Sequence, residues 1–290
     1  MQQNALKKWL LYYLSITILA LVPVQSALAW GADGHRLICA MAETKLTPAA
    51  KAMLSETLRM GKFLDDGAEE NFPEACLWPD KSRYTTHKGS YEWHFINVPK
   101  SADSVDFDRD CAALNCIASA IQRSLVYLSR KAQGKREKAR KAAAIRFLAH
   151  FIGDLHQPLH AGNSEDWGGN KIKVNWYGKK VNLHALWDTE ILRKAGITYP
   201  ESLEYLSEVQ PEDRTTNVLD WIRNSFRLAR NSAYRNAEDN LIVTGDMLGD
   251  ASFERAKPIV ISQITLSANR LAYLLNELAA GTLDTNILIE

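Results

Sequence analysis

The sequence predicts a mainly α-helical protein that has one domain and one small β-hairpin. Long stretches place apolar residues at helical spacing, whereas a single segment alternates apolar and polar residues around a glycine. The 290 residues are enough for one large domain, and they contain no internal repeat, low-complexity tract or linker that would divide it. We therefore expect the helices to pack around one common core.

The expected helices follow one another along most of the chain. Thr47 is a good N-cap and Pro48 a good first helical residue, so one helix begins there. Pro158 should end a long amphipathic helix whose first half is basic and solvated. The segment 171–184 alternates around Gly178 and is expected to form the hairpin. Apolar periodicity predicts further helices over about 116–131, 135–155, 185–193, 216–236 and 251–278.

The first 29 residues have the pattern of a signal peptide. Two lysines precede an apolar run over 9–22, and Ala27-Leu28-Ala29 has the small-x-small form that signal peptidase cleaves. The apolar run is too short for a comfortable membrane span. We expect residues 1–29 to be removed and residues 30–290 to form a soluble, exported domain without a membrane anchor, either periplasmic or secreted.

Cleavage after Ala29 would change the chemistry of the next residue. It would free the α-amine of Trp30, and His35 lies five residues further on. An amine near neutral pH and a neutral imidazole are both nitrogen ligands for metal ions. Processing would therefore create a metal ligand that the precursor lacks. The plainer alternative is that Trp30 is only the residue that follows the cut.

The charge of the chain limits the kinds of surface it can present. The formal charge of the precursor is +1, and the signal segment contains two lysines and no acid, so the processed chain is close to −1. This balance argues against the broad basic surface that duplex DNA binders use. Nucleic acid is still a possible substrate, because a site that holds two or three divalent cations carries its own positive charge.

Four cysteines follow the signal segment: Cys39, Cys76, Cys111 and Cys116. An even number in an exported chain suggests two disulfides. The last two are close enough in sequence to close a small loop, which leaves the first two as a pair. The alternative is a zinc site made of cysteines, which the lack of paired C-x-x-C spacing disfavours.

Most of the seven histidines lie near a carboxylate at a useful spacing. His150 and Asp154 are four residues apart on a predicted helix and share one face, and His184 and Asp188 repeat this spacing. A single pair of this kind is weak evidence, because the same spacing also occurs by chance. Here the two pairs are accompanied by His160, His94, Asp80, His35 and the candidate amine of Trp30. Nitrogen and carboxylate ligands without thiolate are typical of a hydrolytic zinc cluster, and their number suits three zinc ions.

These residues lie in short motifs whose order and combination are specific: Trp30-Gly-x-x-Gly-His35, Trp78-Pro-Asp80, Trp93-His94-Phe-Ile-Asn97, His150-Phe-Ile-Gly-Asp154-x-His-Gln-Pro-Leu-His160, Gly168-Gly-Asn170 and Asn182-Leu-His184-x-x-Trp187-Asp188. Over essentially the whole processed chain the sequence resembles the zinc-dependent single-strand-specific nucleases of fungi and plants, the type I nucleases. These belong to a superfamily that also holds bacterial zinc phospholipase C. The resemblance implies a single-domain, multi-helix phospholipase C/nuclease-like fold, and residues of the expected types fill all nine ligand positions.

The resemblance also implies how the ligands divide among three zinc ions. Asp80, His94, His150 and Asp154 would hold one; His160, His184 and Asp188 a second; and the amine and carbonyl of Trp30, with His35, a third, which Asp154 would bridge to the first. The spacing of the residues predicts the cluster, whereas only the family implies this division.

The implied activity is hydrolysis of single-stranded DNA and RNA to products that end in 5′-phosphate, with 3′-mononucleotides as further candidate substrates. The trinuclear cluster would activate water, so no strong protein base is required. Asp80 would orient the water and Arg83 would contact the phosphate. The resemblance implies no stable protein partner besides these substrates.

The resemblance places three residues at the base of a bound nucleotide. Phe95 would stack on the base, Asn97 would read its edge, and Asn170 would line the same pocket. The family often has Asp where this chain has Asn97, which leaves the base preference open. Stacking requires a base to leave its own stack, so a single strand is preferred. The plainer alternatives are that Phe95 is a core residue, Arg83 a surface charge and Asn170 a turn residue.

Two histidines are left out of the metal set. We expect His156 to orient a metal ligand by a hydrogen bond without binding the metal itself, and His87 to be an exposed loop residue.

Two other functions are compatible with parts of the sequence. One is a zinc phospholipase C, which Asp188 opposes because that branch has Glu at this ligand. The other is a non-catalytic exported zinc-binding protein, which a missing ligand would favour; no ligand is missing. The sequence contains no Asn-x-Ser/Thr sequon, so N-glycosylation is not expected.

Overall fold

A computed structural model describes residues 30–61, 71–209, 217–283 and 285. The expected signal peptide and the expected helix start at Thr216 lie outside these residues. Within the described ranges, no helix combines the length and the apolar character needed to cross a membrane. The structure is mainly helical and has one small sheet, as the sequence predicted.

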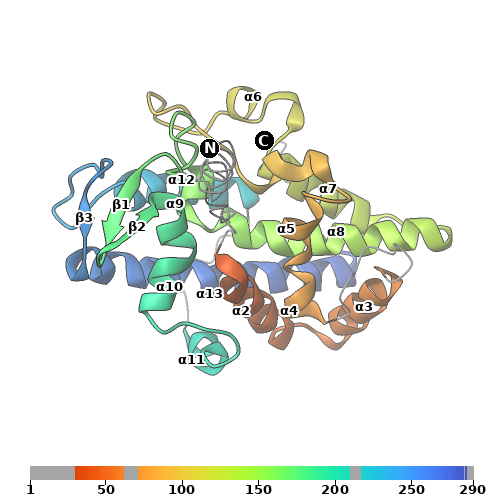
Figure 1. Cartoon of the computed structure of the whole chain (residues 1–290). Helices are drawn as coiled ribbons and strands as arrows, with labels where there is room; N and C mark the ends of the chain where they lie inside the picture. Colours follow the sequence, from red (N-terminus) through yellow and green to blue (C-terminus); the bar gives the residue numbers. More distant parts are fainter. Residues whose placement is uncertain (1–29, 62–70, 210–216, 284, 286–290) are drawn as a thin grey trace, which may run out of the picture.

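Two long helices, α8 (Gly134–Leu155) and α13 (Asp250–Ala280), run through the molecule (Figure 1). Helix α2 (Gly31–Thr44) packs mainly on α13, and α7 (Ile117–Ser129) packs on α8. Shorter helices surround them: α3 (Pro48–Arg59), α4 (Phe72–Ala75), α5 (Trp78–Ser82), α6 (Phe107–Asp110), α9 (Leu183–Ala185), α10 (Ile191–Lys194), α11 (Leu203–Glu208) and α12 (Val218–Leu228). The chain also forms 3₁₀ turns at Lys88–His94, Ala112–Leu114 and Pro158–Ala161.

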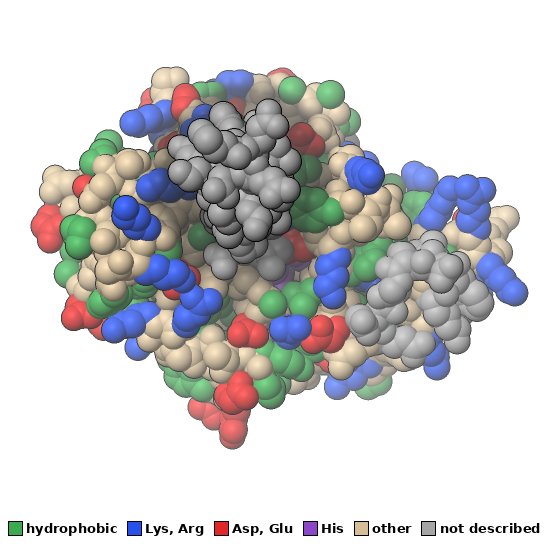
Figure 2. All heavy atoms as spheres, viewed as in Figure 1, with side chains coloured by type: hydrophobic (Ala, Val, Ile, Leu, Met, Phe, Trp, Pro, Cys, Tyr) green, Lys and Arg blue, Asp and Glu red, His purple; other side chains and the backbone are tan. Residues whose placement is uncertain are grey.

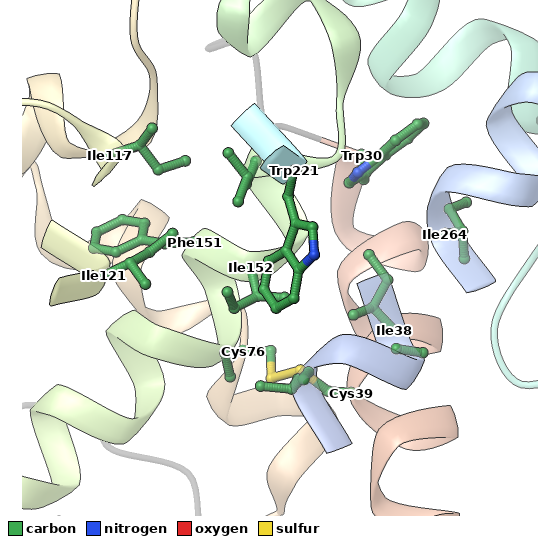
Figure 3. Close-up of a cluster of buried hydrophobic side chains, with 14 of the residues drawn as sticks. Trp30, Ile38, Cys39, Cys76, Ile117, Ile121, Phe151, Ile152, Trp221 and Ile264 are labelled. Carbon is green, nitrogen blue, oxygen red and sulfur yellow. A yellow bond between two sulfur atoms is a disulfide. The ribbon is translucent and has the colours of Figure 1, made fainter. Parts of the chain in front are cut away.

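The second half of α8 lies at the centre of the core. Every residue from Ala142 to Leu155 is buried, whereas most of the basic first half is exposed, as expected. Figure 3 shows Phe151 and Ile152 of this helix among apolar side chains from other helices. Burying such a side chain stabilises the fold by roughly 1.5–3 kcal/mol. The same burial fixes His150 and Asp154, which lie on this segment.

Most of the predicted helices are confirmed with ends that differ by a few residues. Thr47 accepts a hydrogen bond from the Ala50 amide at 3.2 Å, so the predicted N-cap is correct. The helix expected over 185–193 is divided into α9, a π-helical turn at Leu186–Glu190, and α10. A second π turn, Ala229–Ala233, extends α12. Such wide turns often occur at functional sites, and the first one contains Asp188.

The predicted hairpin consists of β1 (Lys173–Trp176) and β2 (Lys179–Asn182), which pair antiparallel with Val174 opposite Val181. Its turn residues Tyr177 and Gly178 both have positive φ, which matches the right-handed twist of the strands. A third strand, β3 (Met247–Leu248), pairs parallel to β1 and was not expected. Two residues are too few to produce a recognisable strand pattern in the sequence.

Two disulfides join Cys39 to Cys76 and Cys111 to Cys116, which are the two expected pairs. The first connects α2 to the end of α4 and is buried among apolar side chains (Figure 3). The disulfide thus joins the helix that contains His35 to the segment just before Asp80. With all four cysteines in disulfides, the alternative of a cysteine zinc site is excluded.

Candidate metal centre

The histidines and carboxylates singled out from the sequence come together from several elements. Helix α2 supplies one histidine, α5 one aspartate, and α8 a histidine and an aspartate. The 3₁₀ turns Lys88–His94 and Pro158–Ala161 and the helix α9 supply one histidine each, and the π turn after α9 supplies Asp188. Their donor atoms form three groups, each with its atoms within 4.8 Å of one another: His35, His150 and Asp154; Asp80, His94 and His150; His160, His184 and Asp188. These residues are all at most 7% exposed. We call these residues together the metal centre.

Asp154 lies between two of these groups. Its Oδ1 atom is 3.2 Å from His35 Nε2, and its Oδ2 atom is 2.8 Å from His94 Nδ1. The His150 ring stacks on the His35 ring, with a centroid distance of 4.0 Å, and its Nε2 is 3.3 Å from Asp154 Oδ2. Because its two oxygens face different histidines, the carboxylate has the arrangement that a bridging metal ligand requires.

Backbone carbonyl groups orient three of the histidines. Each ring donates its Nδ1–H to a carbonyl oxygen: His150 to Cys76 at 2.7 Å, His160 to His94 at 2.6 Å and His184 to Gly168 at 2.7 Å. With the proton on Nδ1, the lone pair of Nε2 faces the metal centre. These bonds fix both the tautomer and the direction of each ring, which is how metal-binding histidines are commonly held.

Trp30 lies against the same part of α8. Its side chain is fully buried, and its indole Nε1 donates to the Gly153 carbonyl at 2.8 Å, one residue before Asp154. Two motif glycines make this packing possible. A Cβ atom at Gly34 would lie 2.6 Å from the Cβ of Trp30, and one at Gly153 would lie 2.8 Å from His35 Nδ1. Any larger residue at these positions would push the tryptophan or the histidine away.

Burial and charge keep most of the donor groups in the form that binds a metal. Burial lowers the pKa of His160 to about 3 and that of His184 to about 4, so both imidazoles are neutral above these values. Burial alone would raise the pKa of Asp154, but His150 and His160 hold it well below its usual range. Burial raises the pKa of Asp188 well above its usual range. A bound cation would favour the charged form of this carboxylate.

Several buried donor atoms of the metal centre have no hydrogen-bond partner among the described residues: His94 Nε2, His160 Nε2 and Asp188 Oδ2. Leaving a buried polar atom without a partner costs roughly 1–3 kcal/mol. Metal ions would satisfy these atoms, since neutral imidazoles and carboxylates are ligands that zinc accepts. The residues present therefore fit a metal cluster.

Gln157 holds Asp188 in place, a role that the sequence interpretation missed. Its Nε2 donates to Asp188 Oδ1 at 2.5 Å, and its Oε1 accepts from the Leu159 amide at 2.6 Å. The side chain is fully buried. It lies inside the motif between Asp154 and His160, which was the available signal, but sequence spacing does not reveal a contact with a residue 31 positions away.

We predict that Gln157→Leu weakens metal binding or activity by about 10–100-fold, the usual effect of removing a group that orients a metal ligand. The substitution keeps the volume of the side chain and removes its donor to Asp188. A zinc titration of the metal-free variant measures the change, and Gln133→Leu at an exposed position serves as control. An affinity equal to that of the unsubstituted chain would contradict this role.

Of the expected substrate residues, Arg83 contacts the metal centre through Asp80. Arg83 is 8% exposed, and its Nη1 lies 3.2 Å from Asp80 Oδ1. Its guanidinium lies over the rings of Tyr84 and Tyr91, both of which are exposed. Phe95 is half-buried and meets Tyr91 edge to face at 5.6 Å. Arg83 is therefore not an isolated surface charge, and Phe95 is not a core residue.

Asn97 and Asn170 are both half-buried. The side chain of Asn170 donates from Nδ2 to the Trp167 carbonyl at 2.8 Å, a contact within its own turn. This contact agrees with the plainer alternative, in which Asn170 is a turn residue.

The structure corrects the expectation for His87. It is half-buried rather than exposed, and its ring meets those of Trp78 and Phe147 edge to face. His156 is buried and hydrogen-bonds the Ile152 carbonyl and Arg270, and its expected role in orienting a ligand stays a prediction.

Comparison with known proteins gives a consistent result. A family model described as S1/P1 Nuclease matches residues 30–280. Endonuclease 1 of Arabidopsis thaliana is 32% identical over 288 residues, which cover 91% of this chain and 91% of the relative. Nuclease P1 of Penicillium citrinum is 34% identical over 204 residues, covering 67% of this chain and 72% of the relative. Nuclease S1 of Aspergillus oryzae is 31% identical over 194 residues, covering 66% and 64%. The chain therefore belongs to the S1/P1 nuclease family, whose members are metal-dependent hydrolases of single-stranded nucleic acid.

Proposed function

We propose that the protein is an exported nuclease that uses three zinc ions to hydrolyse single-stranded DNA and RNA, leaving 5′-phosphate ends, with 3′-mononucleotides as further substrates. The observation that carries the proposal is the set of three buried donor groups around Asp154, several of whose atoms have no hydrogen-bond partner among the described residues. Zinc is the favoured metal because the donors are imidazole and carboxylate groups without thiolate.

The proposed ligands are those expected from the family. Asp80, His94, His150 and Asp154 would hold one zinc, and His160, His184 and Asp188 a second. Trp30 and His35 would complete the third site with Asp154. The donor atoms of His150 belong both to the group with His35 and Asp154 and to the group with Asp80 and His94. The His150 ring stacks on His35 and would nevertheless bind the first zinc.

The third site requires removal of residues 1–29, because the amine of Trp30 exists only after cleavage. Two observations support this processing. The family match begins at residue 30, directly after the predicted cleavage site, and Trp30 is anchored against α8 beside Asp154. Mass measurement of the protein from an exporting host, expected to give a chain that starts at Trp30, tests it.

When bound, the zinc ions would lower the pKa of water and polarise the phosphate. The chain's own residues would do the rest. Asp80 would accept a hydrogen bond from the attacking water and orient it. Arg83 would donate to a phosphoryl oxygen, since Tyr84 and Tyr91 flank its guanidinium and Asp80 holds one of its nitrogens. The low exposure of these groups limits competition by bulk water and strengthens each charge–charge contact.

Phe95 and Asn97 would hold the base of the nucleotide at the metal centre. The Phe95 ring is partly accessible and supported by Tyr91, so a base can stack on it. Asn97 follows two residues later and carries both a donor and an acceptor for a base edge. A base in a duplex would first have to leave its stack, which accounts for the preference for single strands.

We predict that Phe95→Ala raises KM for a single-stranded 12-mer of thymidylate about tenfold, because stacking contributes roughly 1–3 kcal/mol per base. Zinc content should stay the same, since no ligand is touched. Steady-state kinetics of the zinc-loaded variant measure the change, with Tyr273→Ala on α13 as an exposed aromatic control. An unchanged KM would remove Phe95 from the proposed binding site.

The experiment that tests the function is cleavage of single-stranded DNA by the chain 30–290 after chelation and after zinc is restored. We expect cleavage to disappear and return, and the products to end in 5′-phosphate. Chelation should also lower the unfolding temperature, because a ligand at 100 times its Kd stabilises the folded state by about 2.7 kcal/mol. Recovery with magnesium but not with zinc would contradict the choice of metal.

The two alternative functions would give distinct results when other substrates and the zinc content are also measured. Hydrolysis of phosphatidylcholine without cleavage of DNA or RNA would identify a phospholipase C. Full zinc occupancy without hydrolysis of any phosphodiester would identify a non-catalytic zinc-binding protein. Family membership favours the nuclease over both.

A further inference from the structure

The most basic part of the chain lies where α8 begins. The segment 130–141 contains seven lysines and arginines and one acid, Glu137, so its formal charge is +6, whereas that of the whole precursor is +1. The rest of the molecule is therefore net acidic. Figure 2 shows lysine and arginine side chains at the end of the molecule where α8 begins, on the right of the view. A charge distribution this uneven attracts polyanions to one place, even in a protein that is nearly neutral as a whole.

The side chains of this segment are accessible to an external partner. Arg136, Lys138 and Arg140 are exposed and make no ion pair with any residue that the structure describes. The one acid is already used, because Glu137 accepts from the Gln133 amide at 2.5 Å, where the helix begins. Arg136 and Arg140 are four residues apart, a spacing at which like charges destabilise a helix. Neither packing nor ion pairing within the described residues accounts for these three charges.

The basic end of α8 and the metal centre share one face of this helix. Basic, aromatic and metal-binding side chains follow one another in steps of three, four or seven residues: Arg136, Arg140, Phe147, His150 and Asp154. At a rise of 1.5 Å per residue, Arg140 lies roughly 15 Å along the helix axis from His150, and Arg136 roughly 21 Å. A single helix therefore holds the basic side chains at a fixed distance from the metal ligands.

A cleft of about 270 Å³ between α7 and α8 lies along this face. Arg123 of α7 and Arg140 of α8 both line it. Phe151 lines it as well and meets the ring of His94 edge to face at 5.1 Å. Trp93, the residue before His94, forms part of the wall, and the Arg123 guanidinium lies over its ring at 4.8 Å. The cleft therefore extends from the basic segment to a side chain that contacts the metal centre.

The composition of this surface favours one kind of partner. The structure describes every residue from 129 to 141, and no large apolar side chain is exposed among them. Helices that bind a membrane surface present such side chains beside their basic ones, whereas a nucleic-acid backbone requires only positive charges. At a rise of about 3.4 Å per nucleotide, a strand that covers 15–21 Å has roughly four to six nucleotides. A single strand held at the metal centre can reach these charges, and a dinucleotide cannot.

We propose that Arg123, Arg136, Lys138 and Arg140 form a docking surface for the phosphate backbone of a single strand whose scissile bond lies at the metal centre. The surface binds by charge alone, so it favours long strands over short ones and does not distinguish between bases. The inference rests on the proposed function, because the docked strand is the one that the metal centre cleaves.

The test compares a 20-mer of thymidylate with a thymidine dinucleotide as substrates of the zinc-loaded chain 30–290. The variant Arg136→Gln/Lys138→Gln/Arg140→Gln removes three charges and keeps side chains that form helices well. At low salt it should raise KM for the 20-mer about tenfold and leave KM for the dinucleotide, and kcat for both, within twofold. For the 20-mer, the slope of log KM against log salt concentration should fall by about 2, since each phosphate contact on a single strand contributes roughly 0.7.

Two further variants show whether position and charge are both required. Lys45→Gln/Lys51→Gln/Arg227→Gln makes the same change of charge at exposed positions outside α7 and α8, and should leave KM for the 20-mer within twofold. Arg136→Lys/Arg140→Lys keeps the charge and should keep KM. An equal rise in KM for the first of these variants would reduce the effect to net charge and overturn the docking surface. An unchanged KM for the triple variant of α8 would overturn it as well, and so would an equal rise for the dinucleotide.

An anionic membrane is the other surface that a basic segment could bind. Sedimentation with phosphatidylglycerol vesicles at 150 mM salt distinguishes the two, and we expect the unsubstituted chain and the triple variant of α8 to stay in solution alike. Binding to vesicles that the triple variant loses, together with an unchanged KM for the 20-mer, would overturn the assignment to nucleic acid.

Failure of the proposed function would be seen separately. If the zinc-loaded chain cleaves no single strand, the Kd of the fluorescently labelled 20-mer replaces KM as the readout. A Kd about tenfold weaker for the triple variant of α8, and unchanged for the variant outside α7 and α8, supports the docking surface in the absence of cleavage. The same Kd for the unsubstituted chain and both variants overturns it.

Discussion

Replacing Asp154 by Asn is expected to lower kcat/KM on single-stranded DNA by about 10³-fold or more, because metal stabilisation of the transition state contributes several kcal/mol. Asp154 is the carboxylate whose two oxygens face different histidines, so its charge serves two proposed zinc sites at once. Asparagine has the same size but carries no charge and offers a single oxygen. We expect the zinc content to fall below the proposed three ions per chain.

The measurement is steady-state cleavage together with elemental analysis of the same sample. Asp108→Asn, at an exposed position in α6, is the control for the loss of one carboxylate charge. Circular dichroism shows whether the variant is folded. A folded Asp154→Asn protein with full zinc and activity within tenfold of the unsubstituted chain would rule out a bridging role.

Removing the Cys39–Cys76 disulfide is expected to destabilise the protein by about 4 kcal/mol, from the chain entropy that this link removes from the unfolded state. Its partners are 37 residues apart in sequence. The link also has a local consequence, because the Cys76 carbonyl accepts the hydrogen bond that orients His150 at 2.7 Å. The double substitution Cys39→Ala/Cys76→Ala should therefore weaken zinc binding as well as stability.

The second disulfide provides a matched control. Cys111 and Cys116 are five residues apart, so Cys111→Ala/Cys116→Ala should cost only about 2 kcal/mol on the same entropic basis. Denaturant unfolding of both metal-free double variants measures the difference, and zinc titration shows which one affects the metal centre. Equal losses of stability, or zinc binding affected by both variants alike, would contradict the proposed link between Cys76 and His150.

Features that depend on neighbouring residues could be predicted from the sequence. Thr47 and Pro48 begin a helix, the turn at Gly178 closes the hairpin, and His150 and Asp154 lie on one helical face. Each of these follows from local geometry, since four residues make about one helical turn and a positive φ suits glycine. The helix over 185–193 was less regular than predicted, because the π turn around Asp188 leaves no mark in apolar spacing.

Contacts between distant segments were decided only by the tertiary structure. The carbonyl that orients His150 belongs to a residue 74 positions earlier, and the amide that holds Asp188 comes from Gln157. The left-handed backbone of Trp167 depends in the same way on hydrogen bonds within a folded loop. The sequence by itself determined which donor groups exist and that they suit zinc. Packing decided how these donor groups are oriented, which metal sites share them and how deeply they are buried. A hydrogen bond to a backbone carbonyl depends on geometry and not on residue type, so the sequence does not reveal it.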